Sequence, residues 1–234
     1  MLVTLIIFFA VFVQSSVGFG FALVSMPLLV ELLGIQIAAP LVAVVAFTSE
    51  IFVLLRYRHA LQIRTVVRLV IAALVGIPLG ILLLRQVDPI IVTRALGVIL
   101  VAYALYALFS PRLPLLANQL WAYGFGFVAG ILGGAYNTSG PPVIIYGNCR
   151  RWPPNEFKSN LQGFFVFSSI TVVLTHALSG NYTAVVGQNY LYAIPGMVLG
   201  LLAGFSLDGR INPDLFRKIV LVILVVLGIR LIIG

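Results

Sequence analysis

The stretch that decides the fold is residues 130–142, which read GILGGAYNTSGPP. It lies inside an apolar segment, residues 119–147, where a continuous membrane-spanning helix would otherwise be expected. Glycine weakens a helix and proline removes a backbone donor, so we predict that this segment is broken in the middle. Broken backbone at membrane depth is tolerated only inside protein or beside a water-filled cavity. The sequence therefore predicts an interrupted helix next to such a cavity.

The composition around this stretch is that of an integral membrane protein. Of the 234 residues, 62% are hydrophobic and 9% are charged, whereas a soluble domain has roughly 25% charged residues. A spanning helix needs about 20 mainly apolar residues, so we expect one membrane domain over residues 1–234, without a soluble appendage. The expected apolar segments are 2–33, 40–55, 66–84, 90–109, 119–147, 157–178, 188–207 and 214–233.

The net charge of +8 does not indicate a nucleic-acid partner. The basic residues cluster between the apolar segments, where they act as topology signals at the membrane surface. The single cysteine, Cys149, excludes an internal disulfide.

A second segment, residues 2–33, has the same character as the first. It contains QSSVGFG at residues 14–20, followed by a serine and a proline. Several glycines and prolines recur in the same order along the chain, so we predict an internal repeat with halves 1–110 and 118–234. The recurring pairs are Gly20 and Gly134, Pro27 and Pro141, Pro40 and Pro154, Gly76 and Gly196, Gly80 and Gly200, and Pro89 and Pro213. Each of the prolines 40, 89, 154 and 213 is expected at or near the start of a segment, where proline is tolerated.

The basic residues favour a re-entrant form for the broken segments. If every segment crossed the membrane, the basic residues would be nearly balanced between its two sides. If residues 119–147 enter and leave on one side, most basic residues become cytoplasmic, as is usual for Lys and Arg. The cytoplasmic set is then Arg56, Arg58, Arg64, Arg68, Arg112, Arg150, Arg151, Lys158, Arg210, Arg217 and Lys218, and the outer set is Arg85, Arg94 and Arg230.

A matching hairpin at residues 2–33 completes the predicted fold. The class is an all-α polytopic membrane protein, with two repeats that each contain one broken, re-entrant helical hairpin and three transmembrane helices. The odd number of crossings per half makes the repeats inverted and puts both termini outside, an arrangement that recurs among transporters. The alternative is a pair of kinked helices that cross the membrane completely.

The predicted breaks suit the binding of an anion without a basic side chain. A half-helix that begins inside the membrane points unpaired N–H groups, and the positive end of its dipole, at whatever lies before it. Ser139 can cap such a helix, with Pro141 and Pro142 in its first turn, and Ser25 and Pro27 repeat the pattern more weakly. The candidate substrate-binding residues are Gln14, Ser16, Gly18, Gly20, Ser25, Gly133, Gly134, Tyr136, Asn137, Thr138, Ser139, Gly140, Asn160 and Gln162.

Structural roles for these residues stay open beside the functional ones. The glycines and serines can simply let helices pack closely, and Asn160 and Gln162 can hydrogen-bond between helices instead of facing the cavity. Glu50 lies within an apolar segment, where an acid is a functional candidate for proton coupling. It can equally reach toward Arg56 or Arg58. No metal-binding motif is found.

Glycine-rich breaks followed by proline, one per half, resemble the sulfite exporter TauE/SafE family of membrane proteins. The resemblance rests on Gly18-Phe19-Gly20 through Pro27 and on residues 130–142, and it covers nearly the whole chain. It implies transport of sulfur-containing oxyanions, such as sulfite or organosulfonates like sulfoacetate, usually outward across the cytoplasmic membrane. It also implies that the two breaks form the substrate site. The first break has less glycine than many relatives, which leaves the substrate open.

The function we predict is a secondary transporter that binds a small anion at the midplane between the hairpins, while the two repeats rock around it. No nucleotide-binding loop is present, so we do not expect this chain to use ATP. No cofactor is expected. A small-anion channel is an alternative. An intramembrane serine hydrolase using Ser139 and His176 is another, although its nucleophile-elbow motif is missing. The expected partners are the anionic substrate and the lipid bilayer, and the oligomeric state is left open, with a homodimer included.

Overall fold

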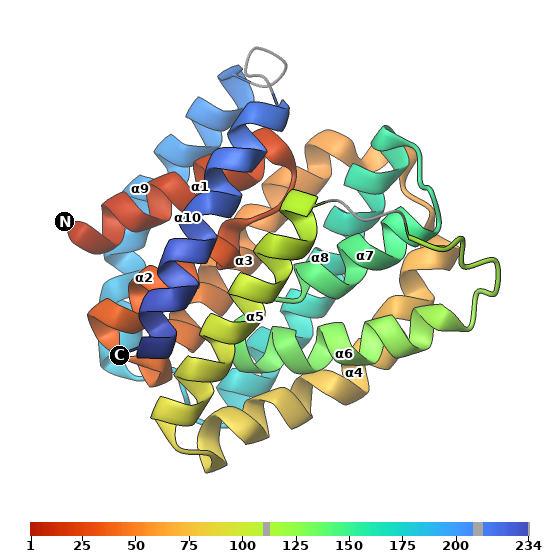
Figure 1. Cartoon of the computed structure of the whole chain (residues 1–234). Helices are drawn as coiled ribbons and strands as arrows, with labels where there is room; N and C mark the ends of the chain where they lie inside the picture. The colour runs from red at the N-terminus through yellow and green to blue at the C-terminus, as the bar shows by residue number, and fades with distance from the viewer. Residues whose placement is uncertain (110–112, 208–212, 234) are drawn as a thin grey trace. The chain divides into compact units, whose positions relative to one another are not determined.

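The computed structural model describes residues 1–109, 113–207 and 213–233 (Figure 1). The side chains of residues 17, 154 and 213–217 are not part of this description. Arg112 and Arg210, and the side chain of Arg217, were assigned to the cytoplasmic side and lie outside the described residues. The described chain contains ten α-helices, one short 3-10 helix and no strand. The predicted all-α class is therefore confirmed.

The helices follow an order of two short and three long elements, and this order occurs twice. In the first half these are α1 (Leu2–Val17), α2 (Phe21–Leu33), α3 (Ile35–Tyr57), α4 (Ile63–Gln86) and α5 (Pro89–Phe109), with the 3-10 helix η1 (Arg58–Ala60) between α3 and α4. In the second half they are α6 (Trp121–Tyr136), α7 (Gly140–Cys149), α8 (Pro154–Leu178), α9 (Ala184–Leu207) and α10 (Pro213–Ile233).

Both predicted helix breaks are present. Within the described residues, α3 with η1, α4, α5, α8 and α9 are each long and apolar enough to cross a membrane. By contrast, α2 has 13 residues and α7 has 10, which is less than the about 20 needed for a span. A polytopic membrane protein is thus confirmed, and neither broken segment is one continuous helix. The re-entrant form of these segments stays a prediction. The inversion of the halves stays a prediction.

Most helix starts agree with the expected prolines, and one does not. Pro89, Pro154 and Pro213 begin α5, α8 and α10. Pro40 lies inside α3, because this helix already begins at Ile35. The chain turns at the preceding glycine, Gly34, which has a positive φ of 76°, so α3 starts earlier than the proline alone indicates.

The described helices form two compact units, and each unit mixes the two halves of the chain. Unit 1 comprises Met1–Val42, Gln86–Arg112 and Tyr182–Gly234, and unit 2 comprises Ala43–Arg85 and Leu113–Asn181. Unit 1 therefore contains the first broken hairpin with α9 and α10, while unit 2 contains the second broken hairpin with α4. The hairpin of one half thus packs with long helices of the other.

In unit 1, α1 packs against α9 at positions that only glycine allows. A Cβ on Gly196 would lie 2.1 Å from the carbonyl oxygen of Thr4, and a Cβ on Gly200 would lie 2.7 Å from that of Phe8. A contact this short between a side chain and backbone cannot persist, so a larger residue would force the helices apart.

In unit 2, α6 packs against α4 in the same way. A Cβ on Gly76 would lie 2.3 Å from the carbonyl oxygen of Phe127, and a Cβ on Gly80 would lie 2.1 Å from that of Ile131. Gly76 and Gly80 were matched to Gly196 and Gly200 in the sequence. The matched glycines thus do the same work, because each pair lets a long helix approach the broken hairpin of the opposite half.

One end of unit 2 brings two basic stretches together. The Ser159 hydroxyl donates to the Tyr57 carbonyl, and the Lys158 Nζ lies 5.2 Å from the centroid of the Tyr57 ring. The start of α8 therefore lies beside the end of α3 and η1. The basic residues around η1 and those before α8 were both assigned to the cytoplasmic side, and their shared location agrees with that assignment.

Candidate functional site

The first break, in unit 1, depends on two glycines. α1 ends at Gly18 with φ 90°, and α2 begins after Gly20, with φ 108°. Residues that carry a Cβ rarely adopt either backbone conformation, so glycine is needed to reverse the chain here. The Gly18 N–H donates to the Gln14 carbonyl at 2.7 Å, which closes the last turn of α1.

Gln14 is the polar side chain nearest this break that has no partner. It is 2% exposed, and neither its Nε2 nor its Oε1 has a hydrogen-bond partner among the described residues. A buried amide left unpaired costs about 1–3 kcal/mol. A ligand oxygen or a water molecule that bonded Nε2 would recover this energy, so Gln14 is a strong candidate ligand-binding group.

The surroundings of Gly20 are apolar in this structure. A cavity of about 10 Å³ lies next to Gly20, which is near the least that holds one water molecule. The residues that line it come from α1, the break itself, α2 and α10, and those of α10 are Val220, Leu221 and Leu224. Within unit 1, the start of α2 is thus covered by apolar residues of α10.

The second break, in unit 2, uses a different residue for its turn. α6 ends at Tyr136, and Asn137 then adopts a left-handed φ of 54°, which asparagine tolerates better than most residues. The N–H groups of Asn137 and Thr138 donate to the Gly133 carbonyl at 2.8 Å and to the Leu132 carbonyl at 3.2 Å. The buried Thr138 hydroxyl donates to the Tyr136 carbonyl at 3.0 Å. Thr138 can therefore donate to a ligand only after its hydroxyl rotates.

The start of α7 places the prolines as predicted but leaves Ser139 without its predicted bond. Gly140 is the first helical residue, so Pro141 and Pro142 occupy the next two positions. Ser139 precedes the helix and makes no side-chain capping hydrogen bond, so the capping prediction is wrong. A capping side chain accepts from the N–H groups of the second or third helical residue, and proline has none. The Ser139 hydroxyl is consequently left for a ligand.

Both breaks present backbone donors that the chain does not use. The N–H groups of Ser139 and Gly140 have no backbone acceptor among the described residues. At the start of α2, Val24 is the first residue whose N–H is bonded, to the Gly20 carbonyl at 3.1 Å. Such donors at the positive end of a helix favour an anion. In the described part of the chain, the N–H groups of α2 that have no backbone acceptor are those of Phe21, Ala22 and Leu23.

Ser25 and Pro27 do not start a helix, so this part of the prediction is wrong. Gly20 is the residue before α2, and both Ser25 and Pro27 lie inside the helix. The buried Ser25 hydroxyl donates to the Phe21 carbonyl at 2.9 Å, and Ser16 likewise bonds a carbonyl of its own helix. Gly20 and Ser139 therefore hold equivalent positions, because each directly precedes the second helix of its broken segment. The sequence match had instead equated Gly20 with Gly134.

Two adjacent glycines of α6 have different neighbours. A Cβ on Gly134 would lie 2.1 Å from the carbonyl oxygen of Ile77 in α4, so Gly134 allows close helix packing. A Cβ on Gly133 would lie 3.3 Å from the Cβ of Ser139, so Gly133 borders the break itself. Gly140 lies beside an aromatic ring of α8. Binding roles for these glycines stay predictions.

Asn160 has a structural role in unit 2. It is fully buried, its Oδ1 accepts from the Gln62 N–H at 2.8 Å, and its Nδ2 donates to Glu156 Oε1 at 3.3 Å. The bond to Gln62 ties α8 to the chain between η1 and α4, whereas the bond to Glu156 lies within α8. Gln162 is also fully buried. Residues two apart on a helix point to different sides, and a binding role for Gln162 stays a prediction.

Glu50 is buried against α8 rather than paired with an arginine. Its side chain is 7% exposed, and the Ser169 hydroxyl donates to Glu50 Oε2. It forms no ion pair with Arg56 or Arg58 in the described structure. The sequence did not indicate Ser169, because a serine in an apolar helix usually bonds its own backbone and nothing local relates it to Glu50.

The serine–histidine pair considered above is not formed. Ser139 makes no hydrogen bond to His176 within the described chain. The imidazole of His176 is fully buried, and its Nδ1 lies 2.8 Å from the Asn181 Nδ2 in the turn after α8.

Interrupted helices with unused donors, set among long apolar helices, define a polytopic membrane protein of the broken-helix kind found among transporters. The sequence model of the family described as "Sulfite exporter TauE/SafE" matches residues 3–231. The chain therefore belongs to the sulfite exporter TauE/SafE family, as its residues indicated.

A curated relative from Cupriavidus necator is named "Probable sulfite/organosulfonate exporter TauE". It is 26% identical to this chain over 225 residues, which cover 93% of this chain and 88% of the relative. No solved structure matches this chain.

Proposed function

We propose that this chain is a secondary transporter that exports sulfur-containing oxyanions, such as sulfite or organosulfonates, across the cytoplasmic membrane. The family match and the name of the Cupriavidus relative support the substrate class. The observation that carries the proposal is the presence of unused N–H donors at the starts of α2 and α7, each directly after a helix break.

The donors suit a sulfonate or sulfite group, which spreads its negative charge over three oxygens. In unit 2, the N–H groups of Ser139 and Gly140 and the Ser139 hydroxyl can each donate to one oxygen. In unit 1, the Gln14 amide and the first turn of α2 offer the same kind of donor. A helix start carries only about half an elementary charge. Binding without a fixed cation is therefore reversible, as a transported substrate requires.

In this proposal, Glu50 provides coupling to protons. An acid within a membrane span is a functional candidate by default, and the described partner of Glu50 is the hydroxyl of Ser169 rather than a cation. If Glu50 gains and loses a proton in each cycle, export is driven by the proton gradient.

The same proposal places both chain termini outside the cytoplasmic membrane and assigns no covalent chemistry to the protein. The loop between α8 and α9 carries no charged residue over positions 179–187, which is typical of an outer loop.

Binding and exchange measurements test the proposed function. Purified protein is titrated with sulfite, sulfoacetate, sulfate and acetate, and reconstituted protein is tested for uptake into vesicles loaded with each anion. We expect saturable binding of sulfite or sulfoacetate, and uptake that internal substrate accelerates. A channel would conduct without this acceleration. Failure of every sulfur oxyanion to bind would remove the substrate assignment.

A further inference from the structure

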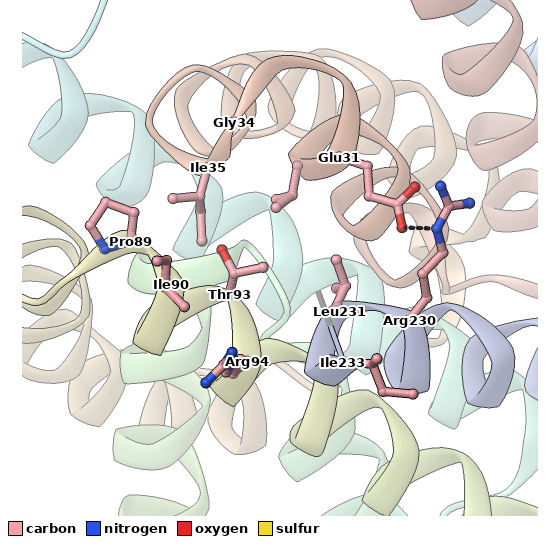
Figure 2. Close-up of a pocket in the computed structure, with 11 residues that line it drawn as sticks. Glu31, Gly34, Ile35, Pro89, Ile90, Thr93, Arg94, Arg230, Leu231 and Ile233 are labelled. Carbon is pink, nitrogen blue, oxygen red and sulfur yellow. Dashed lines mark ion pairs between the residues drawn. The ribbon is translucent and has the colours of Figure 1, made fainter.

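Unit 1 contains a pocket that none of the residues of the helix breaks line. The pocket has a volume of about 600 Å³, within the range of about 300–1,000 Å³ typical of small-molecule sites. It is formed by the end of α2, the start of α3, the first turns of α5 and the last turn of α10 (Figure 2). Four helix ends meet there.

The charged groups of this pocket have a net positive charge. On one side, Arg230 Nε and Glu31 Oε1 form an ion pair at 2.9 Å. Arg94 and Thr93 lie on the α5 side of the pocket, apart from this pair (Figure 2). Within the described residues, Arg94 has no acidic partner and the Thr93 hydroxyl has no hydrogen bond. An anion in the pocket would therefore find one uncommitted cation and one uncommitted donor.

The rest of the pocket wall is apolar. Ile90 and Ile233 are each more than half exposed, and Val30, Ile35 and Leu231 complete the wall. A small inorganic anion would leave this wall uncovered. A molecule with both an anionic group and a hydrocarbon part would satisfy the arginine and remove apolar surface from water, at roughly 25 cal/mol per Å².

The location favours a lipid over a soluble amphiphile. Three of the four helices at the pocket, α3, α5 and α10, are long and apolar, and the ends of such helices reach the membrane surface, where lipid headgroups lie. Basic pockets between transmembrane helices on the cytoplasmic side are known to bind anionic headgroups. The same charge attraction applies on the outer side, to which Arg94 and Arg230 were assigned. We propose that this pocket binds an anionic phospholipid, with the phosphate at Arg94 and Thr93 and an acyl chain along the apolar wall.

Opposite charge changes test the proposal. The protein is purified in detergent, and binding of phosphatidylglycerol and of phosphatidylcholine is titrated by native mass spectrometry. Arg94→Gln should weaken phosphatidylglycerol binding about fivefold, which corresponds to about 1 kcal/mol for one basic residue at the surface. Glu31→Gln should strengthen it by about the same factor, because it removes a repulsive carboxylate and releases Arg230. Arg85→Gln is the matched control, since Arg85 is exposed, carries the same charge and does not line the pocket.

The two variants have opposite signs, so damage to the fold cannot imitate the expected result. Equal affinity for the two lipids would overturn the proposal, as would unchanged binding in Arg94→Gln. Inorganic phosphate and sulfite are added as competitors. If either displaces the lipid at millimolar concentration, the pocket is a small-anion site and the lipid assignment is wrong.

Discussion

Gly133 and Gly134 are adjacent in α6, and we expect their replacement to separate stability from substrate binding. A Cβ on Gly134 would lie 2.1 Å from the carbonyl oxygen of Ile77 and 3.0 Å from its carbonyl carbon. Both are backbone atoms, so alanine at 134 must push α6 away from α4. A Cβ on Gly133 would meet the Cβ of Ser139 at 3.3 Å, which requires a shift of only a few tenths of an ångström.

The distances give the expected magnitudes. Overpacking of this kind costs about 1–3 kcal/mol, and alanine recovers about 0.5–1 kcal/mol relative to glycine in a helix. Gly134→Ala should therefore lose about 1–2 kcal/mol, or about 2–8 °C in Tm for a chain of this size. Gly133→Ala should stay within about 1 kcal/mol of the natural protein. Gly124→Ala is the control, because a Cβ there meets nothing within 4 Å.

Thermal unfolding in detergent and titration with sulfite or sulfoacetate measure the two effects. We expect Gly133→Ala to fold normally but to bind about tenfold more weakly, because a hydrogen bond to a charged group contributes about 1.5–3 kcal/mol and Ser139 is displaced. If Gly134→Ala has the same Tm as the unsubstituted protein, the description of the contact between α4 and α6 is wrong. If Gly133→Ala binds with full affinity, the start of α7 is not part of the substrate site.

Three further predictions concern binding, coupling and topology. Gln14→Leu should leave stability unchanged or raise it by up to about 1 kcal/mol, measured by thermal unfolding, because it removes an unpaired buried amide. The same variant should bind substrate more weakly in a titration, and unchanged affinity would exclude Gln14 from the site. Glu50→Gln should abolish transport driven by a proton gradient but retain substrate exchange, measured in vesicles, and proton-driven transport in this variant would refute the coupling role. In a Cys149→Ser background, a membrane-impermeant maleimide added to intact cells should label Ala184→Cys and not His59→Cys, and the reverse result would invert the topology.

The sequence was sufficient for features that depend on neighbouring residues. The scarcity of charge requires a lipid environment, and glycine, asparagine and proline interrupt helices through their own backbone geometry. Both breaks were therefore predicted at about the right residues. The same local reasoning failed at Ser139, where the following prolines removed the donors that its cap would have used. It also failed at Ser25, because α2 already begins at Phe21 and Ser25 lies inside it.

Only the tertiary structure decided which helices meet. The sequence predicted two repeats, residues 1–110 and 118–234. In the structure, the contacts of α1 with α9 and of α4 with α6 join helices of both repeats within each compact unit. Contacts between distant segments also give Gly134 a different neighbour from Gly133, and they place the Ser169 hydroxyl against Glu50. A residue's backbone preferences act within about one helical turn, whereas its packing neighbours come from anywhere in the chain. Helix breaks and boundaries can therefore be predicted from neighbouring residues, whereas the contacts between helices are known only from the packed structure.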